Sequence, residues 1–395
     1  MKTRLKKRDP SQKTPTYIYQ EEGRYIAQVA ENMGGPAAEE LAALGATDIQ
    51  SLFRSIHFCA QPADLYRINY SSRLISRILA PLISFSCQQT DTLYEQAKTI
   101  AWKQFFLKNR TFAVYANVSD SDVTHSHFAA LRVKDAIADY FRENTGRQRP
   151  DVNTISPDIR INLHLWKNQA TISIDTSGEP LHKRGYREES VIGPMQETVA
   201  AGILYLTEWD GIQPLYDPMC GSGTLLCEAL MRRANVPAGI FRKTFGFEAL
   251  PDFDNTLWQQ VRQEADAAIR ELPENLIAGS DIDRATVSAA RTNLMGMHFG
   301  SRVSVSQNDF RDLSGMENHL IVTNPPYGIR MGKNQNLTVF YKELGDFLKQ
   351  KCRGSLAFIY LGDRSYIKSI GLKATWKKPL HAGGLDGRLV RYDLY

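Results

Sequence analysis

Residues 217–224 read Asp-Pro-Met-Cys-Gly-Ser-Gly-Thr and lie between an expected strand at 215–217 and a helical segment. Gly221 and Gly223 allow the backbone of such a turn to come close to a ligand, where a side chain would obstruct the approach. In a sheet of mainly parallel strands this turn lies at the carboxyl ends of the strands, where ligands bind. The two glycines therefore predict a ligand site built largely from backbone.

Two common nucleotide sites do not match this turn. The dinucleotide pattern G-x-G-x-x-G is not completed, because Thr224 and two leucines follow Gly223. A phosphate-binding loop would need a Gly-Lys-Ser or Gly-Lys-Thr sequence, and none follows here. The pattern therefore favours neither a dehydrogenase nor a nucleoside triphosphatase.

The carboxyl-terminal half has the alternating texture of an α/β protein. Expected strands alternate with helical segments, which is typical of a mainly parallel sheet with helices on both faces. A final hairpin at 374–380 and 389–394 would complete a seven-stranded, Rossmann-like sheet. The expected strands before this hairpin are residues 215–217, 276–280, 303–306, 320–323 and 356–361.

A second motif, Asn324-Pro325-Pro326-Tyr327, follows the apolar run at 319–323. Successive prolines fix the turn, so the side-chain oxygen of Asn324 and the carbonyl of Pro325 stay available as hydrogen-bond acceptors. Tyr327 provides a flat ring on which an extruded base could stack. An exocyclic base amine needs such acceptors, because its lone pair is delocalised until its hydrogens are redirected. In an arbitrary protein such a tetrapeptide would be an ordinary turn. Here it follows an expected fourth strand downstream of the glycine turn, and the two motifs together predict methyl transfer to a base amine.

Acidic residues after the second and third expected strands suit a nucleoside-bearing cofactor. Asp281 ends the second strand and could accept hydrogen bonds from two ribose hydroxyls, while Asp283 is expected to cap the next helix. The long spacing from the glycine turn predicts an insertion at about 232–275. Asp309 could accept a hydrogen bond from an adenine amine with Phe310 packed nearby. Without the other motifs, a loop carboxylate or helix cap would be the better interpretation of Asp309.

The amino-terminal half predicts two smaller α+β units. Residues 1–22 are basic, with six Lys or Arg among the first thirteen, and are expected to form a flexible leader. The strand at 25–29, helix at 37–44 and strand at 52–58 begin a ferredoxin-like unit. A second unit is expected to contain an amphipathic helix at 125–144 and a hairpin at 159–174.

A basic group at Arg142, Arg147 and Arg149 could meet phosphates, or could be a solvated helix end. No stretch approaches the roughly 18 apolar residues of a membrane span, and the amino terminus lacks the apolar segment of a secretory signal. Five scattered cysteines suit a reducing cytosol, and their spacing predicts no metal site. We therefore expect a cytoplasmic protein without a metal, and nothing in the sequence predicts an oligomeric state.

With these motifs the chain resembles the THUMP-containing RNA guanine-N2 methyltransferases. It is most similar to the large-subunit rRNA type, represented by the amino-terminal half of a bifunctional bacterial enzyme. Residues 134–137, Lys-Asp-Ala-Ile, and 181–187, Leu-His-Lys-Arg-Gly-Tyr-Arg, carry the resemblance together with the two motifs above. The resemblance implies a leader at 1–22, a ferredoxin-like domain at 23–86, an RNA-binding THUMP domain at 87–178 and a class I methyltransferase domain at 179–395.

The resemblance also implies a cofactor, S-adenosylmethionine, and an RNA substrate, with rRNA favoured and tRNA as an alternative. Asn324, Pro325 and Tyr327 would then hold the guanine. Cys220 is in the cofactor turn rather than after the fourth strand, so we interpret it as a packing residue and not as a nucleophile. The cofactor site is expected at Asp217, Gly221, Gly223, Asp281 and Asp309, at their neighbours Pro218, Cys220, Thr224, Ile282 and Phe310, and at Asn324. Pro326 is expected to complete the catalytic turn.

Two rival functions share parts of this pattern. DNA adenine-N6 methyltransferases use the same tetrapeptide, but the amino-terminal half resembles an RNA-binding module and has no recognisable DNA-reading motif. A non-catalytic RNA-binding or assembly factor would not need the glycine turn and the tetrapeptide that this chain retains. The sequence therefore favours an RNA methyltransferase.

Overall fold

The structure is a computed structural model that describes residues 16–145, 148–189, 195–326, 336–381 and 386–395. The chain folds into two compact units. Unit 1 holds residues 1–25, 79–175 and 249–252, and unit 2 holds residues 26–78, 176–248 and 253–395. In the described part of the chain, no helix is long and apolar enough to cross a membrane.

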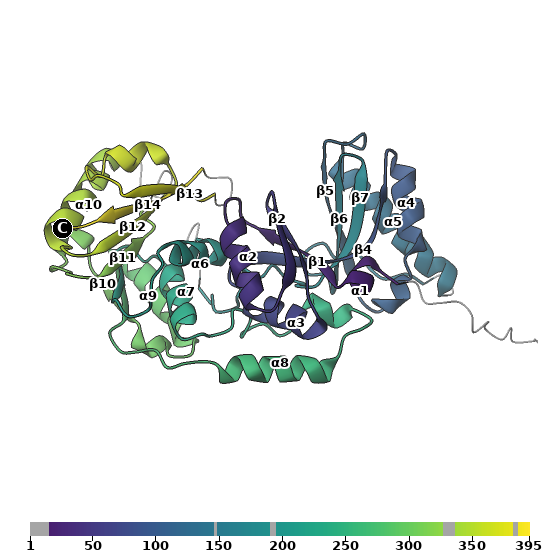
Figure 1. Cartoon of the computed structure of the whole chain (residues 1–395), viewed down its shortest axis with the longest axis horizontal. Helices are drawn as coiled ribbons and strands as arrows, with labels where there is room; N and C mark the ends of the chain where they lie inside the picture. The colour runs from purple at the N-terminus through teal and green to yellow at the C-terminus, as the bar shows by residue number, and fades with distance from the viewer. Residues whose placement is uncertain (1–15, 146–147, 190–194, 327–335, 382–385) are drawn as a thin grey trace, which may run out of the picture. The chain divides into compact units, whose positions relative to one another are not determined.

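Unit 1 is built on a sheet with the strand order β4-β7-β6-β5, in which β5 and β6 are parallel and the other pairs antiparallel. Helices α4 and α5 pack against one another, and α5 packs against β5 (Figure 1). The elements of this unit are α1 (Ile18–Glu22), the second part of β4 (Ile75–Ser86), α4 (Thr90–Thr99), η1 (Trp102–Gln104), β5 (Phe112–Ser119), α5 (Ser126–Asn144), β6 (Ile159–Trp166) and β7 (Gln169–Asp175).

The hairpin of β6 and β7 is confirmed, and it follows from local chemistry. Alternate residues of the two strands are buried and pair across the hairpin, as Leu163 does with Ile172. Lys167 and Asn168 at the turn both have positive φ, 47° and 60°, as a tight two-residue hairpin turn requires.

The expected flexible leader at 1–22 needs a correction at its end. Residues 1–15 are outside the described part, but residues 18–22 form helix α1. Tyr17 and Tyr19 are 2% and 1% exposed, and the hydroxyl of Tyr19 donates a 2.9 Å hydrogen bond to Asp252 of the same unit. These two buried rings supply the apolar area that orders the segment. The basic composition of residues 1–22 had predicted a flexible leader instead.

Unit 2 begins with the sheet order β2-β3-β1-β4, which has the connectivity of a ferredoxin-like fold. The expected single strand at 52–58 is wrong, because residues 47–59 form two antiparallel strands. Strand β2 is mostly exposed and so lacks the alternation that predicts a strand. These elements are β1 (Arg24–Val29), α2 (Gly34–Ala43), β2 (Thr47–Leu52), β3 (Ser55–Cys59), α3 (Pro62–Ser71) and the first part of β4.

The second sheet of unit 2 has seven strands in the order β10-β9-β8-β11-β12-β14-β13, as expected. The first five are parallel, β14 is antiparallel to β12, and the chain reverses its winding direction between β8 and β11. In open α/β sheets ligands bind at this reversal. The strands are β8 (Leu215–Asp217), β9 (Ile277–Asp281), β10 (Ser304–Gln307), β11 (Leu320–Thr323), β12 (Leu356–Leu361), β13 (Trp376–Pro379) and β14 (Arg388–Asp393).

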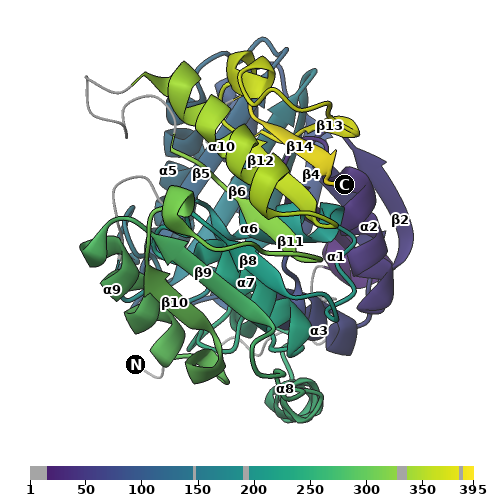
Figure 2. The same ribbon diagram turned by 90° about the vertical axis from the view of Figure 1, so that its left-hand side faces the viewer.

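Helices cover both faces of this sheet. Figure 1 shows α10 on one face and α6, α7 and α9 on the other, and Figure 2 shows α10 crossing in front of the strands. Helix α10 packs its apolar side into a core that includes Phe310, Ile321 and Ile359. The helices are α6 (Glu197–Leu206), α7 (Thr224–Arg233), α8 (Asn255–Ala267), α9 (Arg284–Met295) and α10 (Leu337–Lys351), with short η2 (Gly246–Ala249), η3 (Gly300–Arg302), η4 (Phe310–Asp312) and η6 (Arg364–Lys368).

The expected insertion between β8 and β9 carries α8 and packs against α3. Tyr66 and Tyr70 of α3 lie edge-on to Trp258, with ring centroids 6.2 and 5.3 Å apart. The hydroxyl of Tyr70 also donates a 2.6 Å hydrogen bond to Asp266. The insertion therefore fastens the ferredoxin-like segment of unit 2 to the seven-stranded segment.

Candidate active site

The two glycines of the turn at 217–224 perform different tasks. Gly221 and Gly223 both have positive φ, 55° and 81°, a conformation that favours glycine. A Cβ atom on Gly223 would lie 3.2 Å from the Cβ atom of Ala290 in α9, so this glycine allows close helix packing. A Cβ atom on Gly221 would have no heavy atom within 4 Å. The turn therefore leaves open space beside the backbone of Gly221.

Asp281 joins this turn to the end of β9. Its Oδ2 accepts a hydrogen bond of 3.0 Å from the Gly221 N–H, and its Oδ1 accepts one of 3.0 Å from the Asp283 N–H. Burial raises the pKa of Asp281 above its ordinary value. Asp283 accepts a hydrogen bond from Thr286 and caps α9, which confirms its expected role. Ile282, between them, is 64% exposed and offers apolar surface beside the turn.

Asp217 is the last residue of β8, at the start of the glycine turn, and is only 1% exposed. Its Oδ1 accepts hydrogen bonds of 2.7 Å from the Thr323 hydroxyl and 3.1 Å from the Met219 N–H. Burial raises its pKa to about 7, although these two hydrogen bonds act in the opposite direction. Asp217 therefore ties the glycine turn to the residue that precedes Asn324.

Asn324 has the most informative side chain of the second motif. Its Oδ1 atom is buried and has no hydrogen-bond partner among the described residues. A buried acceptor of this kind costs roughly 1–3 kcal/mol when it is left unpaired. Pro325 is buried, and the Pro326 carbonyl accepts a 3.2 Å hydrogen bond from Tyr341 of α10, which holds the turn in place. Tyr327 lies outside the described residues.

Asp309 and Phe310 follow β10. Asp309 caps η4 through the Arg311 N–H at 3.0 Å and pairs with the Arg311 guanidinium at 2.7 Å, as the cap interpretation predicts. Phe310 is buried and packs edge-on against Phe340 and Phe347. The Asn308 N–H donates to the Asp281 carbonyl, so this segment adjoins the end of β9. A contact from Asp309 to adenine stays a prediction.

Cys220 packs inside the turn. Its side chain is buried, and burial raises the pKa of its thiol well above the ordinary value. A thiol with a raised pKa is a poor source of the nucleophilic thiolate. No cluster of three or more His, Cys, Asp or Glu side chains that could hold a metal ion occurs in the part of the chain that the structure describes.

The basic group of unit 1 is placed only in part. Arg142 pairs with Asp139 at 2.8 Å on the exposed side of α5, and Arg149 is exposed. Arg147 lies outside the described residues. Both described arginines belong to unit 1, whereas the site residues of the seven-stranded sheet belong to unit 2. An RNA contact at this basic group stays a prediction.

Arg187 is a site residue that the sequence motifs do not indicate. Its guanidinium donates to the hydroxyls of Ser222 and Thr224 at 3.4 and 3.1 Å and to the Glu197 carboxylate at 2.8 Å. Asn293 of α9 adds a 3.1 Å hydrogen bond to the Ser222 carbonyl. Arg187 is the last residue of the stretch 181–187, which carries part of the family resemblance. That resemblance drew attention to the segment but implied no role for the Arg187 side chain.

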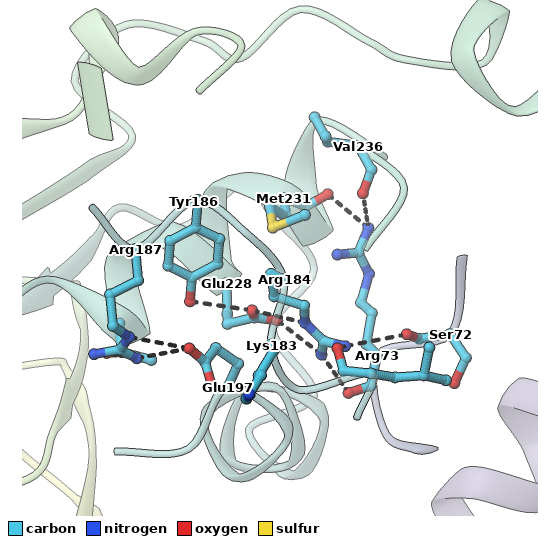
Figure 3. A network of polar contacts seen from close by, with 12 residues as sticks. Ser72, Arg73, Lys183, Arg184, Tyr186, Arg187, Glu197, Glu228, Met231 and Val236 are labelled. Atoms are coloured by element: carbon cyan, nitrogen blue, oxygen red, sulfur yellow. Dashed lines mark hydrogen bonds and ion pairs between the residues drawn. The ribbon is translucent and has the colours of Figure 1, made fainter. Parts of the chain in front are cut away.

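Next to Arg187 lies a buried network around Glu228 of α7 (Figure 3). Arg184 and Glu228 are each 1% exposed and pair at 3.3 Å, and the Tyr186 hydroxyl donates to the same carboxylate at 3.3 Å. Arg184 also donates to the carbonyl of Arg73 at 2.6 Å. The network joins the helix that follows the glycine turn to residues of the ferredoxin-like segment.

A glycine turn after the first strand, a carboxylate after the second and an Asn-Pro-Pro turn after the fourth all lie at the carboxyl ends of one sheet. This arrangement defines an α/β domain of the methyltransferase class. The family model for the RMKL-like methyltransferase domain matches residues 184–391, the THUMP model matches 87–175 and the RlmL ferredoxin-like model matches 24–79. The chain belongs to the RMKL-like methyltransferase family, and the expected fold class is confirmed.

Named relatives are similar along most of the chain. "Putative RNA methyltransferase slr0064" of Synechocystis sp. is 38% identical over 372 residues, 94% of this chain and 97% of that protein. The ribosomal RNA large subunit methyltransferase K/L of Syntrophotalea carbinolica is 36% identical over 384 residues, 94% of this chain but 53% of that protein. The chain thus spans about half the length of the K/L relatives that it matches.

Two solved structures are also similar. "SMU.472, a putative methyltransferase complexed with SAH" has a TM-score of 0.83 and 28% identity, covering 94% of this chain and 98% of that one. A "predicted N6-adenine-specific DNA methylase" of Listeria monocytogenes has a TM-score of 0.82 and 26% identity, covering 95% and 97%.

Proposed function

We propose that this chain transfers a methyl group from S-adenosylmethionine to the exocyclic N2 amine of a guanine in large-subunit rRNA. The chain is a methyltransferase by family, and an RNA substrate and this cofactor agree with its THUMP match and with its relatives. One observation carries the chemistry: the buried, unpaired Oδ1 of Asn324 at the end of β11. An amine hydrogen is the partner that this atom lacks among the described residues.

The residues around the glycine turn fit S-adenosylmethionine. The open space at Gly221 allows a ligand to approach the backbone, Asp281 can accept ribose hydroxyls, and exposed Ile282 can cover one face of an adenine. When bound, the cofactor supplies a methyl group on a positively charged sulfur. Buried Asp217, whose pKa is about 7, holds the turn from below rather than contacting the ligand directly.

The Asn-Pro-Pro-Tyr motif would orient the guanine. Asn324 Oδ1 and the Pro325 carbonyl would accept hydrogen bonds from the two N–H groups of the amine, which turns the nitrogen lone pair toward the methyl group. In the displacement the nitrogen would gain the methyl group and lose one proton to solvent, while the sulfonium would become a neutral thioether. Positioning of this kind supplies much of the rate. We propose stacking of the guanine on Tyr327 from the sequence motif alone.

RNA is favoured over DNA by the amino-terminal half. The THUMP match covers residues 87–175, and Arg142, Arg147 and Arg149 lie within it as proposed phosphate contacts. A ribosomal RNA substrate would place the activity in the cytoplasm. We also propose the domain bounds 23–86, 87–178 and 179–395.

The proposal is tested by methyl transfer from labelled cofactor to hypomethylated rRNA, to tRNA and to duplex DNA, with the modified nucleoside identified by mass spectrometry. We expect N2-methylguanosine in rRNA. N2-methylguanosine in tRNA alone would move the substrate to the tRNA alternative. N6-methyladenine in DNA would overturn both the guanine and the RNA parts of the proposal.

A further inference from the structure

A cavity of about 510 Å³ lies in unit 2, and none of the site residues described above lines it. The lining residues come from the end of β1, the turn between β2 and β3, the start of β4, the linker at 180–182, the first turn of α6 and the segment between β13 and β14. This volume lies within the roughly 300–1,000 Å³ of small-ligand pockets. The cavity is therefore large enough for one nucleotide.

The lining of the cavity includes basic and neutral nitrogen groups. Arg54, at the exposed turn between β2 and β3, forms no ion pair with any described residue. The His182 ring has no hydrogen-bond partner in the described part of the chain. Burial, followed by Arg184 and Arg77, lowers its pKa to about 4, so the ring is neutral near pH 7 and sits in an electropositive environment. Such a lining suits a phosphate oxygen.

Carboxylates also line the cavity. Asp386 lies 3.0 Å from the His381 ring, and Glu31 lies 3.9 Å from it. Carboxylate oxygens repel phosphate but accept hydrogen bonds from hydroxyl and amine groups. A ligand that satisfies both kinds of group needs an anion and hydrogen-bond donors. A ribonucleotide has this arrangement, because it joins a phosphate to a 2′-hydroxyl and a base.

The first turn of α6 separates this cavity from the cofactor turn. Glu197 in this turn accepts a hydrogen bond from Arg187 (Figure 3). Arg187 also donates to the Thr224 hydroxyl. Thr198 and Val199, the next residues along the helix, line the cavity. Asp386, which also lines the cavity, comes two residues before Arg388, and Arg388 pairs with Leu361 at the carboxyl end of β12. The cavity therefore lies at the same edge of the sheet as the Asn324 turn.

We propose that the cavity binds one nucleotide of the RNA substrate beside the methylated guanine, with Arg54 and His182 on its phosphate and Glu31 and Asp386 on its ribose or base. This inference rests on the proposed function, since it needs an RNA substrate. It assigns to the ferredoxin-like segment a direct contact with RNA that is separate from the THUMP domain.

The test compares Arg54→Asn and His182→Ala with Arg353→Gln, which changes an exposed arginine shortly before β12. Asparagine suits the positive φ of 56° at residue 54, so the first change removes charge without strain. The dissociation constants are measured for a hypomethylated rRNA fragment at several salt concentrations, and for S-adenosylhomocysteine. Thermal unfolding checks that each variant is folded.

We expect both cavity variants to bind the rRNA fragment about 5- to 20-fold more weakly, with S-adenosylhomocysteine affinity unchanged. For Arg54→Asn the slope of log affinity against log salt should be less negative by about 0.7, the value for one phosphate of a single strand. If both folded variants bind RNA as Arg353→Gln does, while wild type methylates RNA, the cavity inference is overturned and the proposed function stands. If wild type methylates only DNA, the proposed function is overturned, and the cavity inference, which needs an RNA substrate, is overturned with it.

Discussion

The hydroxyl of Thr323 donates a 2.7 Å hydrogen bond to the buried carboxylate of Asp217. One residue ends β8 and begins the glycine turn, and the other ends β11 and precedes Asn324. Because this bond lies at the reversal of the sheet, it couples the expected cofactor turn to the expected amine-binding turn. The two motifs, separated by about a hundred residues in the chain, share one buried polar contact.

The raised pKa of Asp217 predicts a pH dependence of stability. The folded state holds the proton up to about pH 7, whereas an unfolded aspartate releases it near pH 3.8. The folded state binds more protons in this window, so the free energy of unfolding should fall as pH rises from about 4 to about 7. Each pKa unit corresponds to about 1.4 kcal/mol. Asp217→Asn should flatten the curve in urea titrations, and an unchanged slope would refute this role.

Asn324→Ala should abolish methyl transfer, because it removes the acceptor that orients the amine. The affinities for S-adenosylhomocysteine and RNA should stay within a few-fold of wild type, since neither depends on this oxygen alone. Single-turnover transfer and equilibrium binding provide the measurements. Asn255→Ala, an exposed change in α8, is the matched control. Retained turnover in Asn324→Ala would remove the proposed mechanism.

Alanine substitutions at the two glycines should have different main effects, one on stability and the other on ligand affinity. Gly223→Ala places a methyl group 3.2 Å from Ala290 in a strained backbone, so the melting temperature should fall. Gly221→Ala has the same backbone strain but enters open space, so its larger effect should be weaker S-adenosylhomocysteine binding. Calorimetry and titration separate the two. If both variants lost the same S-adenosylhomocysteine affinity for each degree of lowered melting temperature, this division of roles would be contradicted.

Arg187 is expected to act as a positioning residue for the cofactor turn. Arg187→Ala should raise the KM for S-adenosylmethionine about tenfold or more, with most of kcat retained at saturating cofactor, because the hydroxyls of Ser222 and Thr224 lose their donor. Arg187→Lys should recover part of this affinity. A loss of kcat with unchanged KM, or no recovery by lysine, would argue for another role.

Arg147→Ala combined with Arg149→Ala should weaken RNA binding and flatten its salt dependence. The slope should change by about 0.7 for each phosphate that the protein no longer neutralises. Cofactor binding should not change. Filter binding of rRNA at several salt concentrations gives the slope, and Arg353→Gln again serves as the control. An unchanged slope would place the RNA elsewhere on the molecule.

Local patterns predicted much of the fold. The hairpin of β6 and β7 and the parallel strands follow from alternation and apolar runs, which depend only on neighbouring residues. Strand β2 was missed because its side chains are mostly exposed and its pairing with β3 comes from the sheet rather than from burial. Helix α1 was missed because two buried tyrosines outweigh a polar, basic context.

The class of the protein could be inferred from the order of its residues, since the glycine turn, the Asn-Pro-Pro-Tyr motif and the strand pattern are all local. Which groups meet depends instead on the folded arrangement. Asp217 finds Thr323, Arg187 finds Thr224 and Arg184 finds Glu228 across gaps of 37 to 106 residues. The packing of the elements decides which of these groups are neighbours. Buried polar groups need hydrogen-bond partners, and no local sequence pattern specifies which residue that partner is.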